Sequence, residues 1–290
     1  MKKIGKYFIF FCILTIALIT TVGCNKSSNS NSSKMKTDYT NYKIPTIFLH
    51  GSDSSYKAEE DMVNFSKKRN AIDNVTKADV NPHGKVTLSG NIPKDAFNPV
   101  IEINFEDSNN NNYYTNGQWL KNVMFALQHK YHFKKFNAVA HSKGNLVLVY
   151  YLLKYGQDDK LPQLQKQVDL AGNFDGTIGT TQPKHLKVNK KTGKPNKMIK
   201  RYKALLPLRK TYPKQIKIIN MMGYYDDENN DGTVSNASSH SLKYLVNKRT
   251  KLYIEKTIIG DGAEHSRLHE NNQQVDYYLT RFLWSKDKDK

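Results

Sequence analysis

Residues 136–156 consist of a short apolar run, then a tight turn of small and polar residues, then a longer apolar run. The first run, 136–140, suits a buried strand. The second, 145–155, ends at Gly156, as expected for a helix packed on a sheet. A strand that passes directly into a buried helix is typical of parallel sheets, which need crossover helices between their strands. This segment therefore restricts the chain to folds in which helices cover a sheet.

The remaining chain alternates between strand-like and helix-like segments, which predicts an α/β fold with a mostly parallel sheet and helices on both faces. Further strands are expected at 44–50, 85–90 (an edge strand), 100–105, 167–171, 216–222 and 252–259. Further helices are expected at 56–69, 118–131, 241–246 and 272–284. In such folds ligands bind at the carboxyl ends of the strands, so we expect the functional residues just after them.

The first 24 residues predict export. Three lysines in residues 1–6 precede an apolar run at 7–19, and Thr21-Val-Gly-Cys24 resembles the lipobox of bacterial lipoproteins. We expect a signal peptide at 1–23, lipidation of Cys24, a flexible tether at 24–40 and one domain at 41–286. Ordinary signal cleavage and a membrane-spanning anchor remain alternatives. Because Cys12 and Cys24 are the only cysteines, a disulfide framework and thiolate zinc sites in the body are excluded.

Ser142 lies in the turn Ala140-His-Ser-Lys-Gly144, between the predicted strand and the predicted helix. This is the setting of a nucleophile elbow, which needs small residues two positions before and after the serine. The following backbone amides and the helix dipole could stabilise an oxyanion. A serine at this position could equally serve as a helix N-cap.

Two further signals fit the same chemistry. His50-Gly-Ser52 follows the first predicted strand, where esterases place a second oxyanion amide; the expected donors are the backbone amides of Ser52 and Lys143. Acid and base candidates follow Ser142 in the order that hydrolases of this kind use. They are Asp226, Asp227 and Asp231 after the strand 216–222, and His265 and His269 after the strand 252–259.

The chain resembles the alpha/beta-hydrolase family of Gram-positive cell-surface hydrolases, which are lipase-like proteins. The resemblance covers about residues 40–285 and rests on four matching stretches: Ile47-Phe-Leu-His-Gly-Ser52, Ala140-His-Ser-Lys-Gly144, Asp231-Gly-Thr-Val-Ser-Asn-Ala-Ser-Ser239 with Ser241-Leu-Lys-Tyr-Leu245, and Glu264-His-Ser-Arg-Leu-His-Glu-Asn271. It implies an alpha/beta-hydrolase fold with Ser142 as nucleophile, Asp231 as acid and His265 as base. The family commonly has Met-Gly-Gly after the serine, whereas this chain has Lys143-Gly-Asn145.

Other roles for these residues are open. Asp227-Glu-Asn-Asn-Asp231-Gly matches the first half of a calcium loop, but Ser238 stands where a glutamate is expected. If Asp231 bound calcium, Asp226 or Asp175 would become the acid candidate. His265 and His269 are four residues apart, a spacing that can bind a metal on a helix. Zinc proteases with this spacing have a glutamate directly after the first histidine, where this chain has Ser266. We therefore expect no metal and no cofactor, and keep His269, Asp227 and Asp175 as reserves.

Positive charge dominates the chain, with 45 Lys and Arg against 26 Asp and Glu. Residues 177–213 hold eleven Lys and Arg and no acid, which predicts a basic lid-like insertion or a solvated excursion. The charge suits an anionic cell envelope better than nucleic acid, for which no motif is present. We expect an exported, lipid-anchored serine hydrolase acting on a small-molecule or lipid ester outside the bacterial membrane. The alternative is a catalytically weak hydrolase fold that binds anionic envelope polymers or a partner protein.

Overall fold

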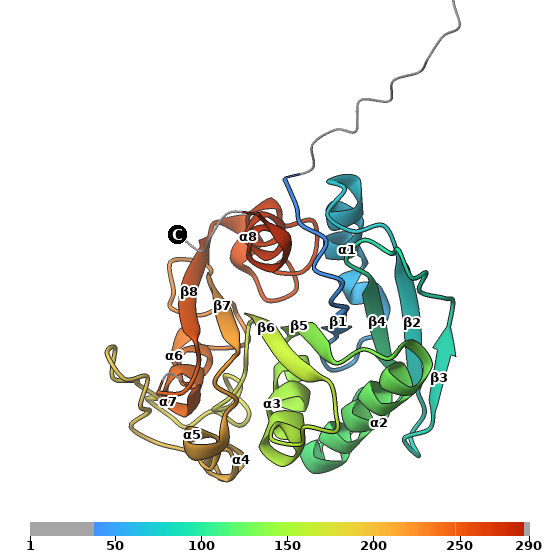
Figure 1. The fold of residues 1–290 in the computed structure, drawn as a ribbon. Coiled ribbons are helices and arrows are strands. Elements are labelled where there is room, and N and C mark those ends of the chain that lie inside the picture. Colours follow the sequence, from blue (N-terminus) through green and yellow to red (C-terminus); the bar gives the residue numbers. More distant parts are fainter. Residues whose placement is uncertain (1–37, 247, 287–290) are drawn as a thin grey trace, which may run out of the picture. The chain divides into compact units, whose positions relative to one another are not determined.

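An eight-stranded sheet in the order β3-β2-β4-β1-β5-β6-β7-β8 forms the middle layer of the computed structural model, which describes residues 38–246 and 248–286 (Figure 1). All neighbouring strands are parallel except the β2–β3 pair, so the predicted mostly parallel sheet is confirmed. The strands are β1 (Thr46–Leu49), β2 (Val75–Val80), β3 (Val86–Ser89), β4 (Val100–Phe105), β5 (Lys135–His141), β6 (Gln163–Leu170), β7 (Lys217–Tyr224) and β8 (Leu252–Ile259).

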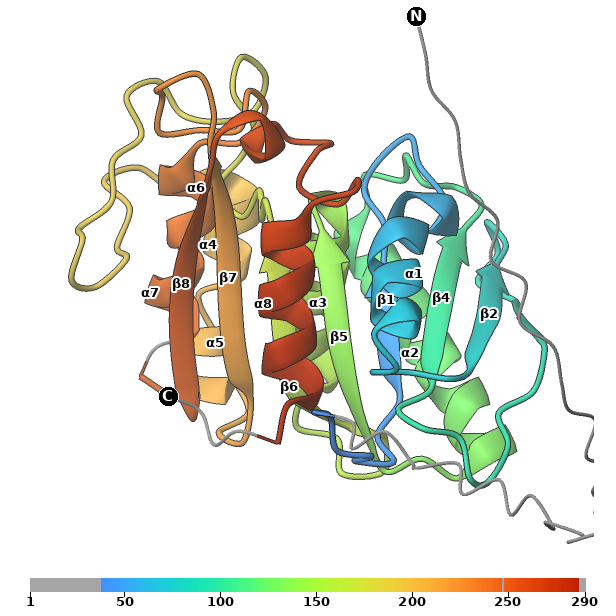
Figure 2. The ribbon, with the colours of Figure 1, turned by 90° about the horizontal axis from the view of Figure 1, so that it is seen from above.

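Helices cover both faces of the sheet (Figure 2). One face carries α1 (Glu60–Lys68), which continues the short 3-10 turn η1 (Tyr56–Glu59), and α8 (Gln273–Trp284). The other face carries α2 (Tyr113–Tyr131), α3 (Lys143–Tyr155), α4 (Lys200–Ala204), α5 (Leu208–Thr211), α6 (Asn236–His240) and α7 (Leu242–Val246). A second 3-10 turn, η2 (Asp261–Ala263), follows β8. None of the helices in the described part of the chain has the length and apolar character needed to cross a membrane.

Two apolar layers hold this arrangement together, one on each face of the sheet. In β1, Ile47 and Leu49 belong to the layer under α2 and α3, and Phe48 belongs to the layer under α1 and α8. Successive strand residues point to opposite faces, so a strand covered on both sides is apolar throughout. Both layers and the whole sheet lie within residues 38–286, so this part of the chain contains a complete core of its own.

The predicted elements appear in the predicted order, and two differences have clear physical causes. β2 was not predicted, because the polar residues Thr76, Lys77 and Asp79 interrupt its apolar residues, so no continuous apolar run marks it as a buried strand. The helix expected at 118–131 begins earlier, at Tyr113, because the Asn112 side chain caps it by accepting the Thr115 amide at 3.2 Å.

The basic segment 177–213 lies between β6 and β7, and its two halves differ. The first half is a loop with an isolated bridge between Val188 and Pro195. The second half contains α4 and α5, and its Tyr202 and Tyr212 are fully buried in the core. Only the first half is therefore a loop on the surface. Its function as a lid stays a prediction.

Candidate active site

Ser142 stands alone between β5, which ends at His141, and α3, which begins at Lys143. Its backbone has φ 50° and ψ −119°, a strained conformation for a residue with a side chain. The Ser142 amide donates to the carbonyl of Leu170 at the end of β6, at 3.0 Å. The chain thus makes the sharp strand-to-helix turn that the small residues around Ser142 predicted.

Asn145, for which no role was predicted, holds this turn in place. Its side-chain amide donates to the carbonyls of Ser142 at 3.1 Å and Leu170 at 2.9 Å. The side chain is fully buried, so these bonds are shielded from water. Asn145 therefore braces the strained serine.

His265 connects Ser142 to Asp231. Its Nε2 lies 3.1 Å from the Ser142 Oγ, and its Nδ1 lies 2.9 Å from the Asp231 Oδ2. Ser142 follows β5, Asp231 follows β7, and His265 follows β8, so three strand ends bring the residues together from distant parts of the chain. With its proton on Nδ1, His265 donates to the carboxylate and leaves Nε2 free to accept the serine proton.

The Asp231 carboxylate is fully engaged by protein donors. Its Oδ1 accepts the amides of Thr233 at 2.9 Å and Val234 at 2.6 Å, while Oδ2 faces His265. Asp231 is buried, and the His265 side chain is 15% exposed. Asp231 is therefore shielded from water, whereas His265 is accessible from the surface.

The loop after β1 approaches the same serine. A Cβ added at Gly51 would lie 3.3 Å from the Ser142 Cβ, so the two backbones are almost in contact. His50 fixes this loop: its Nδ1 donates to the Gly51 carbonyl at 2.8 Å, and its Nε2 accepts the Phe105 amide at 3.0 Å. Burial lowers the pKa of His50, which favours the neutral ring that these two bonds require.

Two backbone amides beside Ser142 are available to a ligand. Within residues 38–246 and 248–286, neither the Ser52 amide nor the Lys143 amide donates a hydrogen bond. The Lys143 amide opens α3, where the first N–H groups of a helix have no intrahelical partner. The Lys143 amide directly follows Ser142, and the Ser52 amide follows Gly51, which closely approaches the serine. An oxyanion role for these two amides stays a prediction.

The Lys143 side chain is turned away from the serine hydroxyl. Its Nζ donates to the Ser108 carbonyl at 2.5 Å, and the residue is only 4% exposed. Burial lowers its pKa, and the nearby Asp107 and Asp53 oppose that shift. The lysine therefore ties the loop after β4 to the start of α3.

Two further histidines, His141 and His269, lie beside His265 or its ring neighbour. The His141 ring lies 4.8 Å from the His265 ring and 4.3 Å from the His269 ring, between centroids. The His141 Nε2 lies 3.0 Å from the His265 carbonyl oxygen, and the His269 Nδ1 lies 2.7 Å from that of Ala58. Burial lowers the pKa of both rings, and for His141 the neighbouring histidines lower it further. His269 was predicted as a reserve base, whereas no role was predicted for His141.

The structure does not bring the other reserves to Ser142. Asp175 accepts the Ile199 amide at 3.0 Å, and burial raises its pKa to about 6. Asp227 lies in an exposed turn with φ 55°. Ser238, the last position of the calcium-loop alternative, donates instead to the Gly176 carbonyl at 2.8 Å. Within the described part of the chain, no group of three or more His, Cys, Asp or Glu is placed to hold a metal ion.

Comparison with known proteins supports this reading of the fold. The model of a family described as "Alpha/beta hydrolase of unknown function (DUF915)" matches residues 33–286. The crystal structure of a Listeria innocua gene product superposes with a TM-score of 0.74 at 25% identity, covering 85% of this chain and 95% of that one. A Lactobacillus plantarum protein assigned as a cell surface hydrolase superposes with a TM-score of 0.66 at 23% identity, covering 82% and 88%. No curated protein matches the chain. The family match spans nearly the whole chain, which therefore belongs to this alpha/beta hydrolase family.

Proposed function

We propose that this protein is a serine hydrolase that cleaves an ester-like acyl substrate. The observation that carries the proposal is the chain of two contacts, 3.1 Å from Ser142 to His265 and 2.9 Å from His265 to Asp231. A serine hydroxyl is a weak nucleophile unless a positioned base takes its proton. The strained turn at Ser142 and the unused amides beside it have no evident packing role, and both suit acyl transfer.

In this mechanism the Ser142 Oγ attacks the acyl carbon while its proton passes to the Nε2 of His265. The carbonyl oxygen becomes an oxyanion and accepts hydrogen bonds from the backbone amides of Ser52 and Lys143, each worth about 3 kcal/mol. His265 then protonates the leaving group, and water releases the acyl group from Ser142 by the same steps. Asp231 keeps the imidazole in its working tautomer and stabilises the imidazolium.

We also propose that the enzyme works outside the cell, held to the membrane by a lipid on Cys24. The support is the signal-like sequence at 1–23, the small residues before Cys24, and the assignment of the Lactobacillus plantarum protein to the cell surface. Residues 1–37 lie outside the described residues. Cys24→Ser should release the protein from membranes or block its maturation, and unchanged membrane retention would favour a spanning anchor instead.

A fluorophosphonate probe tests the catalytic proposal directly. The probe loses fluoride when an activated serine attacks its phosphorus, so the chain from residue 25 onward should gain one adduct, which peptide mapping should place on Ser142. Ser142→Ala is the matched control and should remain unlabelled while keeping its circular dichroism and melting temperature. A folded wild-type chain that gains no adduct, and hydrolyses no ester, would favour the binding-protein alternative.

A further inference from the structure

A small hollow adjoins Ser142 on the face of the sheet that α2 and α3 cover. Its lining includes Gly51, in the loop after β1, and Lys143, the residue after Ser142. A Cβ added at Gly51 would lie 3.3 Å from the Ser142 Cβ and 3.8 Å from its Oγ, so this part of the lining touches the nucleophile. A group bonded to the Ser142 Oγ therefore lies beside the hollow.

The hollow and the proposed base lie on opposite sides of Ser142. Among the strands, β4 and β1 lie on one side of β5, and β6, β7 and β8 lie on the other (Figure 1). The lining comes from the carboxyl ends of β1 and β4 together with α2 and α3, whereas His265 follows β8. In the proposed mechanism the leaving group faces His265, which protonates it. The acyl group points away from the leaving group and therefore toward the hollow.

Apolar side chains form one part of the lining. The Phe105 and Trp119 rings stack with centroids 6.1 Å apart, and Val147 of α3 lines the same hollow. All three side chains are buried. The free space is about 10 Å³, which is about the room that one water molecule needs. A methyl group is of similar size, so the hollow suits a short acyl group and excludes a long one.

The polar side chains of the lining are already hydrogen-bonded within the protein. Both ring nitrogens of His50 have backbone partners. The Asn116 side chain donates to the Asn110 carbonyl at 2.8 Å, and the Asp107 carboxylate accepts the Asn110 side-chain amide at 3.1 Å. Because these groups already have partners, the hollow favours an apolar substrate group over a polar one.

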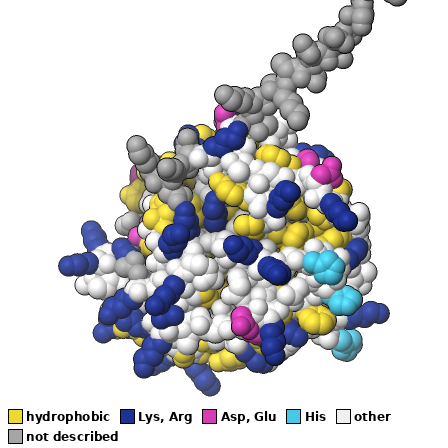
Figure 3. Space-filling model, in the orientation of Figure 1, with side chains coloured by type: hydrophobic (Ala, Val, Ile, Leu, Met, Phe, Trp, Pro, Cys, Tyr) yellow, Lys and Arg dark blue, Asp and Glu magenta, His cyan; other side chains and the backbone are white. Residues whose placement is uncertain are grey.

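The Lys143 side chain occupies the space into which a longer acyl chain would extend. Most lysine and arginine side chains on the face in Figure 3 stand on the surface, but Lys143 is only 4% exposed. Its Nζ donates to the Ser108 carbonyl, so the side chain crosses from the start of α3 to the loop after β4, and both residues line the hollow. Room for a longer chain would require this ammonium to leave its acceptor, which costs free energy at a buried position.

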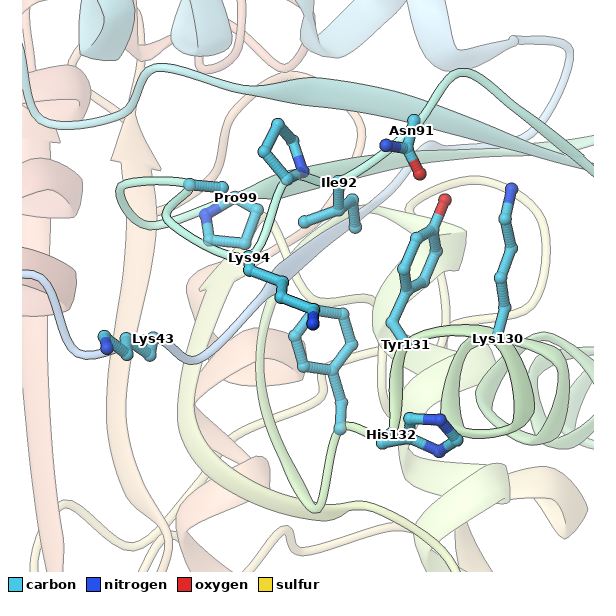
Figure 4. A pocket seen from close by; sticks show the side chains of 11 residues that line it. Lys43, Asn91, Ile92, Lys94, Pro99, Lys130, Tyr131 and His132 are labelled. Carbon is cyan, nitrogen blue, oxygen red and sulfur yellow. The ribbon is translucent and has the colours of Figure 1, made fainter.

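A much larger hollow lies at the other edge of the sheet from the nucleophile. It has a volume of about 570 Å³ and lies at the amino ends of the strands, where Lys43 precedes β1 and Pro99 precedes β4 (Figure 4). Ser142 follows the carboxyl end of β5. The large hollow therefore cannot receive a group bonded to Ser142, whereas the small hollow adjoins it.

We propose that the small hollow receives the acyl group of the substrate and that the Lys143 side chain restricts this group to acetyl size. This inference rests on the proposed serine hydrolase function and names its substrate class, the acetyl esters. Lys143 is thus a specificity-determining residue. Its side chain limits the length of the acyl group by its volume, and this role is separate from the oxyanion role proposed for its backbone amide.

The dependence of hydrolysis on acyl length tests this inference. The kcat/KM values for p-nitrophenyl acetate, butyrate and hexanoate are measured with the chain from residue 25 onward, which includes the complete described domain. Lys143→Ala removes the side chain, and Lys143→Met removes the charge but keeps nearly the same length. Lys154→Ala changes an exposed lysine of the same helix and is the matched control. Circular dichroism and melting temperature check that each variant folds.

We expect the wild type and Lys154→Ala to prefer acetate over hexanoate by about tenfold or more in kcat/KM. Lys143→Ala should reduce this preference by about tenfold, because its hollow admits the longer chain. Lys143→Met should keep most of the preference, because methionine fills nearly the same space.

Similar kcat/KM values for all three esters in the wild type, or an unchanged preference in Lys143→Ala, would overturn the inference. An equal loss of preference in Lys143→Met and Lys143→Ala would also overturn it, because the charge and not the volume would then set the limit. A fluorophosphonate with a methyl group on phosphorus tests the proposed function separately. If Ser142 is labelled while all three esters react alike, only this inference fails. If a folded wild type is neither labelled nor active, the proposed function fails with it.

Discussion

Asp231 holds His265 at two points. The carboxylate Oδ2 lies 2.9 Å from the ring Nδ1, and the Asp231 backbone carbonyl accepts the His265 amide at 2.9 Å. The first contact orients the ring and the second fixes the chain that carries it. The loops after β7 and β8 are thereby joined where Ser142 needs its base.

Asp231→Asn should lower kcat for ester hydrolysis by about 10³- to 10⁴-fold, with little loss of stability. The backbone contact and the shape of the side chain remain. However, the new amide donates toward Nδ1 and favours the tautomer that carries its proton on Nε2, which cannot accept the serine proton. Steady-state kinetics with a chromogenic ester checks this, and Asp227→Asn is the matched control. Equal activity in both variants would remove Asp231 from the mechanism.

All strands except β2, and the turn at Ser142, could be predicted because a short stretch of sequence specifies each of them. A buried strand shows as an apolar run, and a tight turn shows as small residues around one serine. What could not be predicted depends on contacts between distant segments. Asn145 acts by reaching the Leu170 carbonyl, and His141 acts through the His265 carbonyl; neither partner is near in sequence.

His141→Leu should lower kcat by about tenfold and leave KM nearly unchanged, because His141 touches the base and not the substrate. Its Nε2–H donates to the His265 carbonyl, so its loss loosens the backbone that positions the base. His141→Gln, whose amide can still donate, should recover much of the activity. A similar loss in both variants would indicate that the ring matters only for packing, and a raised KM would place it at the substrate.

Glu59→Gln should make the protein more stable at pH 8 and flatten its stability between pH 5 and pH 8. Glu59 is buried, and no described residue hydrogen-bonds its carboxyl oxygens. Burial and the nearby Glu102 raise its pKa from about 4.5 to about 8. The folded state therefore holds a proton that the unfolded state releases above its lower pKa, so stability falls as pH rises through this window.

The gain at pH 8 should be on the order of a few kcal/mol at most. At pH 5, where the native carboxyl is protonated in the folded state, the variant and the wild type should differ little. Urea unfolding at pH 5, 6.5 and 8 measures this, with Glu106→Gln as the exposed control. The variant's free energy of unfolding should still fall somewhat as pH rises, because burial also raises the pKa of Glu102 to about 7. If the free energy of unfolding of Glu59→Gln changes with pH as much as that of the wild type, the Glu59 carboxyl is not the cause of the pH dependence.

Gly144→Ala should destabilise the protein, although alanine favours a helix by about 1 kcal/mol over glycine. A Cβ at this position would lie 2.3 Å from the Leu49 carbonyl oxygen and 2.9 Å from that of His50. Both are backbone atoms of β1 and its loop, so relief requires α3 to move away from the sheet. We expect a loss of about 1–3 kcal/mol, together with weaker labelling of Ser142.

The control for Gly144→Ala is Gly179→Ala, which separates backbone strain from steric clash. Gly179 has φ 73° and no neighbour within 4 Å of an added Cβ, so its substitution should cost about 1 kcal/mol through strain alone. It lies in the loop after β6, so labelling of Ser142 should not change. Urea unfolding and fluorophosphonate labelling of both variants decide the matter. If Gly144→Ala raises stability, helix propensity outweighs the contact, and the close approach of α3 to β1 is not what requires a glycine after the nucleophile.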